Sequence, residues 1–598
     1  MAELAFAHAP RRLKIKINIA PYRVRMSEGR FEYLGAITAY EVRESTVLIA
    51  CGQARVQVSL LAPDLVRVRL SPKGEFEPDY SWAVVKTDWP GVRCALEDRG
   101  DRLEIDTGEL LIRVTKSPCR LSFLSRSGEL IGEDYKPFGM GWRGGRVKCW
   151  KSMPYDEHYF GFGEKTGPLD KRRQRMVMWN TDAYGYGPET DPLYVSIPFF
   201  IGVREGKAYG IFFDNTYRTE FDMGSTSEQY YSFEAEGGEM NYYFFYGPEI
   251  RKIVERFTEL VGRMPLPPKW ALGNQQCRYS YYPASRLLEI ADRFRRRDVP
   301  IDVLYLDIDY MDGYRAFTWD RQRFPDPEGL LSELHERGFK VVTIIDPGVK
   351  ADGSYRVYRE GLLNDSFCKY DTGETYHGRV WPGLCAFPDF TKDDVRSWWG
   401  GLHAELLRFG VDGVWNDMNE PTVFVTRDGE TGASTLDANV LHHDRGLRTP
   451  HAKSHNVYGL LMARAAHEGL LRINPQRRPF VLTRAAYAGI QRYAAVWTGD
   501  NTASWDHLAL QIPMLLNLGL SGVPFVGSDV GGFTGTPSPE LLTRWYQIGA
   551  FVPLCRNHTQ AGTYDQEPWM FGDYYEGIIR RYLRLRYRLI PYLYTALY

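Results

Sequence analysis

Residues 411–421, VDGVWNDMNEP, place carboxyl and amide side chains directly after a short, mostly apolar run. The run 411–415 is too short for a helix and is typical of a buried strand, and Pro421 ends regular structure after it. Asp417, Asn419 and Glu420 therefore follow the carboxyl end of the predicted strand. Barrels of alternating strands and helices build their active sites at that end, where carboxyl groups act as nucleophiles or as general acids and bases. Taken alone, the segment is equally compatible with a strand followed by an Asx turn.

Polar side chains also follow five other predicted strands. The strands are expected at 270–275, 303–306, 341–345, 411–415, 480–483, 494–497, 523–526 and 551–554, with amphipathic helices between several of them, such as 284–296 and 397–409. This alternation predicts an α/β fold, a parallel (β/α)8 TIM barrel. One acidic residue after a strand often caps a helix, but six polar strand ends predict convergence on a site. The residues at these ends are Asp307, Ile308, Asp309, Asp417, Arg484, Asp500, Ser528, Asp529, Arg556, Asn557 and His558.

The first part of the chain has a different pattern, with short alternating or apolar runs broken by Gly, Pro and Asp between about residues 31 and 246. This pattern predicts an all-β, antiparallel β-sandwich. Two segments, 159–169 (YFGFGEKTGPL) and 176–184 (MVMWNTDAY), are expected to be loops, and composition alone favours ordinary sandwich loops. We predict a sandwich domain at 1–248, a linker helix at 249–268 that leads into three prolines, and a barrel at 269–598. The barrel is expected to carry long insertions at about 350–392 and 422–454, and loops of that length are usually functional.

Composition excludes several classes of protein. The 598 residues include 74 Lys and Arg against 75 Asp and Glu, and a net charge of −1 gives no electrostatic case for binding nucleic acid or an anionic membrane. The eight cysteines show no C-x-x-C pair, which fits a reducing compartment and predicts neither a metal site nor a disulfide framework. The N-terminal segment lacks the pattern of a signal peptide, and no apolar stretch has transmembrane length. We therefore expect a soluble, cytoplasmic protein.

The absence of cofactor motifs narrows the chemistry further. The sequence has no H-E-x-x-H, P-loop, G-x-S-x-G or dinucleotide fingerprint, so no metal and no cofactor are expected. A rim of carboxyl groups in a chain that is 14% aromatic suits a carbohydrate, because aromatic faces contact the apolar faces of sugars. Two carboxyl groups suffice to cleave a glycosidic bond, one protonating the leaving oxygen and the other attacking the anomeric carbon or activating water.

The motifs resemble glycoside hydrolase family 31, and its α-glucosidases in particular. The resemblance covers nearly all of the chain and is carried by GFGEK, MWNTDAY, LDIDYMDG (306–313), VWPG (380–383), VWNDMNEP (414–421), RAAYAGIQRYAAVWTGD (484–500), GSDVGGF (527–533) and RNH (556–558). It implies a retaining, exo-acting hydrolase of α-linked glucosides that forms a covalent glucosyl-aspartate. The implied partner is an oligosaccharide or α-glucoside substrate.

The resemblance also implies roles for individual residues. Asp417 matches the nucleophile and Asp500 the general acid/base. Asp307, Arg484 and His558 match positions that bind sugar hydroxyls, and Asp182 matches the N-terminal loop that reaches over the barrel mouth. Glu420 and Asp529 are expected to orient the residues that contact the sugar. The walls of the sugar pocket are matched by Ile308, Trp381, Trp415, Met418, Trp497 and Phe533.

Several points stay open at the level of sequence. An α-xylosidase or an α-transglucosylase would use the same residues, and a non-catalytic sugar-binding protein is the alternative from another class. Members of the family usually continue into further C-terminal β-sandwich domains, which we expect to be absent because the chain ends at Tyr598, in a predicted helix (574–598) interrupted by Pro591. The sequence also leaves open a homo-oligomer.

Overall fold

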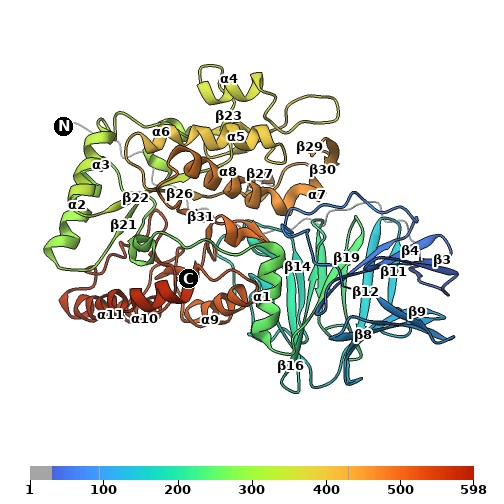
Figure 1. The fold of residues 1–598 in the computed structure, drawn as a ribbon. Coiled ribbons are helices and arrows are strands. Elements are labelled where there is room, and N and C mark those ends of the chain that lie inside the picture. Colours follow the sequence, from blue (N-terminus) through green and yellow to red (C-terminus); the bar gives the residue numbers. More distant parts are fainter. Residues whose placement is uncertain (1–29, 93, 428–429) are drawn as a thin grey trace, which may run out of the picture.

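The computed structural model describes residues 30–598, apart from residues 93, 428 and 429, and contains a β-sandwich beside a parallel barrel (Figure 1). This arrangement confirms the predicted fold class. The first 29 residues lie outside the described residues, and with them lie the predicted start of the sandwich domain and the expected lack of a signal peptide. None of the described helices is long and apolar enough to span a membrane.

The sandwich is built from three antiparallel sheets around one hydrophobic core. The largest has the order β13-β15-β16-β19-β5-β4-β3-β2, with β2 (Ala39–Arg43), β3 (Thr46–Cys51), β4 (Ala54–Ala62), β5 (Leu65–Ser71), β13 (His158–Gly163), β15 (Val195–Arg204), β16 (Lys207–Phe213) and β19 (Met240–Tyr246). The second has the order β1-β11-β12-β18-β17-β14, with β1 (Glu32–Tyr33), β11 (Met140–Arg143), β12 (Arg146–Ser152), β14 (Arg175–Met178), β17 (Thr219–Asp222) and β18 (Tyr230–Ala235). The third has the order β10-β9-β8-β7-β6, with β6 (Ala95–Asp98), β7 (Arg102–Asp106), β8 (Leu110–Lys116), β9 (Cys119–Ser125) and β10 (Leu130–Glu133).

The part of the largest sheet that contains β15, β16 and β19 is buried on both faces, which positions the sandwich against the barrel. Alternate side chains of β15 point to opposite sides: Phe200 belongs to the sandwich core, whereas Phe199 and Ile201 belong to the core shared with the barrel. Helix α1 (Ile250–Val261) lies against this second face, and its Phe257 ring stacks on Phe199 with ring centroids 3.8 Å apart. Helix α1 lies within the range predicted for the linker helix, 249–268, but ends at Val261, and it is located at the contact between sandwich and barrel (Figure 1).

Strand β13 corrects the prediction of a loop at 159–169. Residues His158–Gly163 pair with β15 around a bulge between Gly161 and Gly163, because positive φ at both glycines lets the strand bend there. The bend turns backbone N–H groups toward helix α9 (Trp505–Leu520) of the barrel, where Gly161 donates to Asn517 Oδ1 at 2.8 Å and Gly163 donates to Ser521 Oγ at 2.9 Å. The glycine-rich composition thus marks a bulged edge strand that docks on the barrel.

Eight parallel strand positions form the barrel, in the sheet order β34-β33-β31-β26-β22-β21-β20-β36-β35. The strands are β20 (Asn274–Gln276), β21 (Val303–Leu306), β22 (Lys340–Ile345), β26 (Gly413–Asn416), β31 (Val481–Thr483), β33 (Ala495–Trp497), β34 (Val526–Gly527), β35 (Asp529–Val530) and β36 (Cys555–Asn557). The seventh position is split at Ser528, since β34 pairs with β33 and β35 pairs with β36, and this brings the sheet close to full closure.

The first and last barrel strands differ from the predictions. Residues 269–272 form the 3-10 helix η1 (Lys269–Leu272), so the strand predicted at 270–275 begins at Asn274. The strand predicted at 551–554 begins at Cys555, and Phe551 is 55% exposed in the turn that follows helix α10 (Pro539–Gly549). In both places an apolar run belongs to the approach to the strand rather than to the strand itself.

Helices cover the outside of the barrel (Figure 1). They are α2 (Ala284–Arg296), α3 (Pro327–Glu336), α5 (Asp393–Leu402), α6 (Ala404–Leu407), α8 (Tyr458–Ile473), α9 (Trp505–Leu520), α10 (Pro539–Gly549) and α11 (Asp573–Leu597). Short 3-10 helices lie in the connections: η2 (Ile308–Tyr310), η3 (Asp312–Tyr314), η4 (His455–Val457) and η5 (Ile490–Arg492). The helix predicted at 397–409 is divided at His403. Helix α11 runs through Pro591 without a break, which corrects the predicted interruption.

The two long insertions pack on each other. The first contains β23 (Val349–Lys350), α4 (Arg356–Leu363), β24 (His377–Val380) and β25 (Gly383–Ala386). The second contains β27 (Val423–Arg427), β28 (Glu430–Ser434), β29 (Leu441–Asp444), β30 (Leu447–Pro450) and α7 (His451–Ser454). A small hydrophobic cluster joins them, made of Cys368, Tyr376, Val380, Cys385, Phe387, Val423, Leu436 and Val440.

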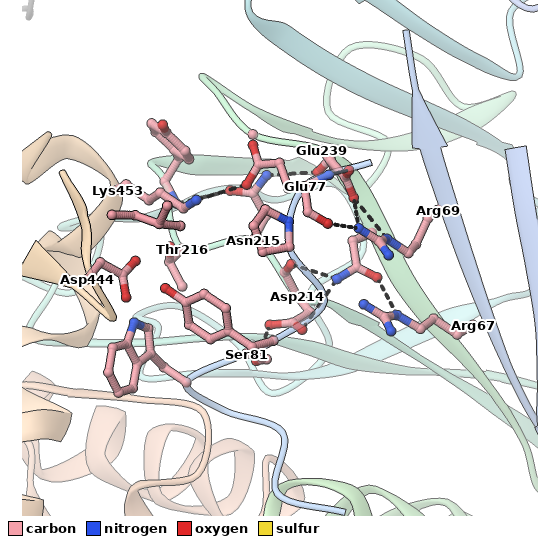
Figure 2. A pocket seen from close by; sticks show the side chains of 17 residues that line it. Arg67, Arg69, Glu77, Ser81, Asp214, Asn215, Thr216, Glu239, Asp444 and Lys453 are labelled. Carbon is pink, nitrogen blue, oxygen red and sulfur yellow. Dashed lines mark hydrogen bonds and ion pairs between the residues drawn. The ribbon is translucent and has the colours of Figure 1, made fainter. Parts of the chain in front are cut away.

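The second insertion also contacts the sandwich, and a pocket of about 70 Å³ lies at this junction (Figure 2). Lys453 of α7 pairs with Glu77 of the sandwich at 2.8 Å, and within the sandwich Arg69 pairs with Glu239 at 2.7 Å. None of the residues predicted to bind or cleave substrate lines this pocket. The Lys453–Glu77 pair joins the insertion to the sandwich.

Phe257→Ala removes the ring that joins α1 to β15, and we expect it to lower the free energy of unfolding by about 3–5 kcal/mol. Urea unfolding followed by tryptophan fluorescence measures this loss. The control is Phe551→Ala, the same truncation at a half-exposed ring, for which we expect a loss of less than about 1 kcal/mol. Equal losses in the two variants would contradict the role given to Phe257.

Candidate active site

The guanidinium group of Arg484 lies at the centre of the site and contacts four carboxyl groups. It forms two parallel bonds to Glu420, each 2.8 Å long. Its Nε lies 3.0 Å from Asp417 Oδ1, its Nη1 lies 3.5 Å from Asp500 Oδ2, and its Nη2 lies 3.5 Å from Asp182 Oδ2. The structure thus brings together one arginine and four of the predicted acidic residues.

The side chains that the barrel contributes follow the carboxyl ends of its strands. Asp417 follows β26, Arg484 follows β31 and Asp500 follows β33 after a turn, so the carboxyl groups of strands four and six flank the arginine of strand five. Asp182 comes from the sandwich, in the loop between β14 and β15. That loop is anchored to the barrel, because β15 pairs in parallel with β32 (Ala486–Tyr487), two residues after Arg484.

Burial and mutual repulsion raise the carboxyl pKa values at this centre. Burial raises the pKa of Asp417 even though the charge of Arg484 opposes the rise. Burial raises the pKa of Asp182 to about 6 and that of Asp500 well above its ordinary value, and neighbouring carboxyl groups add to both shifts. Since one cation cannot balance four buried anions, protons must be retained on part of the cluster. A site that keeps one carboxyl group protonated beside an ionised one is suited to acid/base catalysis.

The floor of the site contains Asp307 and His558. Asp307 accepts a 2.6 Å bond from the N–H of Ile308, the first residue of η2, and its Oδ2 lies 3.8 Å from His558 Nε2. Burial raises the pKa of Asp307 and lowers that of His558 well below its ordinary value. These two groups and the buried side chain of Ile308 lie together, as the sequence predicted.

Two tryptophans and an ion pair line the same floor. The rings of Trp415 and Trp497 meet edge to face at 5.6 Å, and the guanidinium of Arg556 lies 4.7 Å and 4.8 Å from their ring centroids. Arg556 donates twice to Asp529 Oδ1, at 3.1 Å and 2.7 Å. Asp529 therefore holds Arg556 against the tryptophans rather than facing Arg484.

The remaining predicted wall residues lie at different depths. Phe533 packs on His558 with ring centroids 4.9 Å apart, and Met418 accepts a 3.3 Å contact from Arg484 Nη2 at its sulfur. Trp381 is 40% exposed in the turn between β24 and β25, where its ring packs on Tyr279 and Phe424. It belongs to the rim formed by the insertions and is not in contact with the central carboxyl groups.

Asp346 and Tyr194 are site residues that the sequence reasoning missed. Asp346 follows β22 directly, and its buried Oδ1 has no partner among the described residues. The signal, an aspartate after a strand, was present in the sequence at the end of the third strand. Tyr194 places its ring 5.0 Å from the Arg484 guanidinium, and its hydroxyl accepts a 3.4 Å bond from the N–H of Asp500. Nothing in the sequence pattern marks a tyrosine that precedes a sandwich strand.

Two buried clusters have the residue types of a metal site. Cys277, Asp307 and His558 bring possible ligand atoms within 4.8 Å of one another, as do Cys368, Asp389 and His442. Burial raises the pKa of both cysteine thiols well above its ordinary value, whereas a metal ligand must be the thiolate. In both clusters a metal ion would have to displace the thiol proton.

The barrel with carboxyl groups at its strand ends, and a sandwich loop closing over them, defines a glycoside hydrolase. The models of two family domains match the chain: the glycosyl hydrolases family 31 TIM-barrel domain over residues 264–596, and the glycosyl hydrolase 31 N-terminal galactose mutarotase-like domain over residues 55–222. The chain belongs to glycoside hydrolase family 31.

Relatives whose names state an activity support this assignment. "Alpha-glucosidase 2" of Bacillus thermoamyloliquefaciens is 48% identical over 94% of this chain and 70% of its own length. An alpha-glucosidase of Saccharolobus solfataricus is 41% identical over 76% of this chain and 68% of its own length. Among solved structures, a family 31 dextranase of Flavobacterium johnsoniae complexed with isomaltotriose has a TM-score of 0.88, with 37% identity over 95% of this chain and 70% of that chain.

Arg484→Met should lower the free energy of unfolding at neutral pH by about 3–5 kcal/mol, because it leaves buried carboxylates without their cation. Without the arginine their folded-state pKa values rise further. The folded state then binds protons more tightly than the unfolded state, so the loss should grow as the pH rises from about 4 to about 7. Chemical denaturation at those two pH values measures the difference.

The control is Arg296→Met, at an exposed pair with Asp292, which should change stability by less than about 1 kcal/mol at both pH values. A loss in Arg484→Met that shrinks toward neutral pH would contradict the charge balance described above.

Proposed function

We propose that the protein is a retaining, exo-acting α-glucosidase that releases terminal α-linked glucose through a covalent glucosyl-aspartate. The observation that carries the proposal is the convergence of Asp417 and Asp500 on the single guanidinium of Arg484. Retaining enzymes place two carboxyl groups on opposite sides of the anomeric carbon, about 5–5.5 Å apart, and the shared contact with one guanidinium brings Asp417 and Asp500 into one site, which this chemistry requires. The names of the two relatives described above, both alpha-glucosidases, agree with this proposal.

Asp417 and Asp500 divide the chemistry between them. The ionised Asp417 attacks the anomeric carbon while Asp500 donates its proton to the glycosidic oxygen, so the carbon–oxygen bond breaks and a β-glucosyl ester forms. Asp500, now ionised, takes a proton from water, and the resulting attack on the ester releases α-glucose and regenerates Asp417. Arg484 supports the ionised form of Asp417, and burial supports the protonated form of Asp500.

The substrate contacts follow from buried polar atoms that lack partners among the described residues. They include one carboxyl oxygen each of Asp182 and Asp346, Nδ1 of His558, and the indole N–H groups of Trp415 and Trp497. A pyranose carries several hydroxyl groups, each both donor and acceptor, and would pair these atoms. We assign Asp182, Asp307, Arg484 and His558 to sugar hydroxyls and Ile308, Trp415, Met418, Trp497 and Phe533 to the pocket wall. Trp381 would contact the next sugar at the rim, whereas Glu420 and Asp529 orient Arg484 and Arg556.

One observation favours a second type of glycosidic linkage in the substrate. The similar Flavobacterium structure is a dextranase with bound isomaltotriose, so α-linked glucose of isomaltose type is a second candidate substrate. An α-xylosidase or an α-transglucosylase would use the same carboxyl groups. A non-catalytic sugar-binding protein has no use for the paired carboxyl groups at Arg484.

We also propose a cytoplasmic location. All eight cysteines are free thiols, and seven of them are buried, as expected for small apolar side chains in a reducing compartment.

The anomer released first tests the proposal. With p-nitrophenyl α-glucoside, proton NMR during the first turnovers should show α-glucose, which later mutarotates to β-glucose. Asp417→Gly and Asp500→Gly should each lower kcat by about 10³-fold or more while the fold stays intact. Initial release of β-glucose would overturn the retaining mechanism.

Added azide separates the two roles as a matched pair. In Asp500→Gly, azide should attack the glucosyl ester from the face that water uses and give α-glucosyl azide. In Asp417→Gly, azide should replace the missing carboxylate, attack from the opposite face and give β-glucosyl azide when the leaving group is activated. The reverse pattern would exchange the two assignments.

The dependence of kcat/KM on pH should be bell-shaped, with limbs that belong to the coupled carboxyl cluster. Activity should fall as the pH drops through the pKa of Asp417, which burial raises above its ordinary value, because the nucleophile then binds a proton. It should fall again as the pH rises through the higher pKa of Asp500, because the acid is then ionised. With an activated fluoride leaving group, Asp500→Asn should lose the alkaline limb of glucosylation and keep the acid limb.

A further inference from the structure

Two histidines of the second insertion, His442 and His451, and His455, which directly follows it, form a buried line of hydrogen bonds between Asp389 and the sandwich loop. His442 Nδ1 lies 3.0 Å from Asp389 Oδ1, and His442 Nε2 lies 2.9 Å from His451 Nδ1. His451 Nε2 lies 3.2 Å from His455 Nδ1, and His455 Nε2 lies 2.8 Å from the carbonyl oxygen of Asn180. All five residues are at least 98% buried.

The number of hydrogens that this line requires differs from the number that neutral histidines supply. The four contacts need one hydrogen each, because both ends of the line are acceptors: a carboxylate and a carbonyl oxygen. Three neutral imidazoles carry three N–H groups between them. A fully bonded line therefore holds one additional proton, and this proton balances the charge of Asp389.

The surroundings place that proton at one end of the line. Burial lowers the pKa of His451 well below its ordinary value and that of His455 to about 3. Although burial opposes it, the contact with His442 holds the pKa of Asp389 at about 2. The ionised Asp389 faces His442 at 3.0 Å, so the additional proton is expected at this end of the line.

Other polar groups face the line from the elements packed around it. Cys368 Sγ lies 3.8 Å from His442, and Tyr458 of α8 and Asp444 of β29 lie near Asp389. The hydroxyl of Thr435 lies 3.1 Å from His451 Nε2 and 3.0 Å from His455 Nδ1. If the additional proton were absent, two ring acceptors would face each other, and this hydroxyl could donate to only one of them.

The far end of the line holds the loop that carries Asp182. The ring of Trp179 stacks on His455 with centroids 3.7 Å apart, and the Asn180 side chain donates to the carbonyl oxygens of Asn456 and Ala486 at 3.0 Å and 3.1 Å. Asp182 comes two residues later, so its carboxyl group depends on where this anchor lies.

We propose that Asp389, His442, His451 and His455 form a positioning relay that shares one additional proton and fixes the Asn180 carbonyl, and with it the loop that brings Asp182 to the substrate. The part that concerns Asp182 rests on the proposed function. The four residues touch no substrate. They act through the loop.

Kinetics of a double-mutant cycle test the positioning role. His455→Leu removes the bond to Asn180 and should raise KM by about tenfold while kcat changes less, the size expected for loss of one buried hydrogen bond. His455→Gln places an amide N–H where Nε2 lies and should recover part of that loss, which also guards against a failure of His455→Leu to fold. In an Asp182→Ala background, His455→Leu should change KM by less than about twofold, because the coupled residue is already gone.

The matched control is His335→Leu at the His335–Asp412 pair, which has a 2.7 Å bond but lies outside the relay. It should leave KM unchanged. An equal effect of His455→Leu with and without Asp182 would overturn the positioning role.

A count of protected imidazole protons tests the relay independently of activity. With ¹⁵N-labelled histidine, the relay should show four exchange-protected N–H groups, two of them on one ring, and His442→Asn should remove that doubly protonated ring. Three N–H groups, with no ring carrying two, would overturn the shared proton. If the wild type fails to hydrolyse α-glucosides, the proposed function fails, and this count still decides the relay.

Discussion

The positions of the carboxyl groups in the site depend on one buried guanidinium group. Arg484 is surrounded by Asp182, Asp417, Glu420 and Asp500, and burying these charges costs free energy that only close pairing offsets. Glu420 takes the two shortest contacts and so fixes the plane of the guanidinium. The remaining edges of that plane then fix where the other carboxyl groups can lie.

The same constraint explains why the sandwich is part of the site. A barrel alone would supply the arginine and the carboxyl groups of strands four and six, but Asp182 comes from a sandwich loop. The parallel pairing of β15 with β32 joins that loop's following strand to the segment just after Arg484. Together with the α1 contact and the bulged β13, it makes the sandwich a fixed wall of the site.

Much of this arrangement was predictable because it follows from strand ends. Asp417, Arg484, Asp500, Asp307 and His558 all directly follow parallel strands or their short turns, and the carboxyl ends of parallel strands meet at one rim. The wrong strand boundaries concern apolar residues that lie just outside a strand. Ala271 and Leu272 are buried in a 3-10 helix, and Val552–Leu554 form the approach to β36, so apolar character alone placed both strands too early.

Other features left no periodic signal. The bulge in β13 depends on positive φ at two glycines, which composition presents as a loop. The exposure of Trp381 and the contact of Tyr194 with Arg484 depend on how distant segments meet. The family resemblance, not the pattern of residues, supplied the link between Asp182 and the barrel.

The hydrophobic cluster shared by the two insertions has a consequence for how such enzymes can diversify. Val423 and Leu436 of one insertion and Tyr376 and Phe387 of the other complete a single small core. If either insertion were lengthened, shortened or moved alone into another barrel, apolar surface of the other insertion would be exposed. We therefore expect the two insertions to be exchangeable between barrels only as a pair.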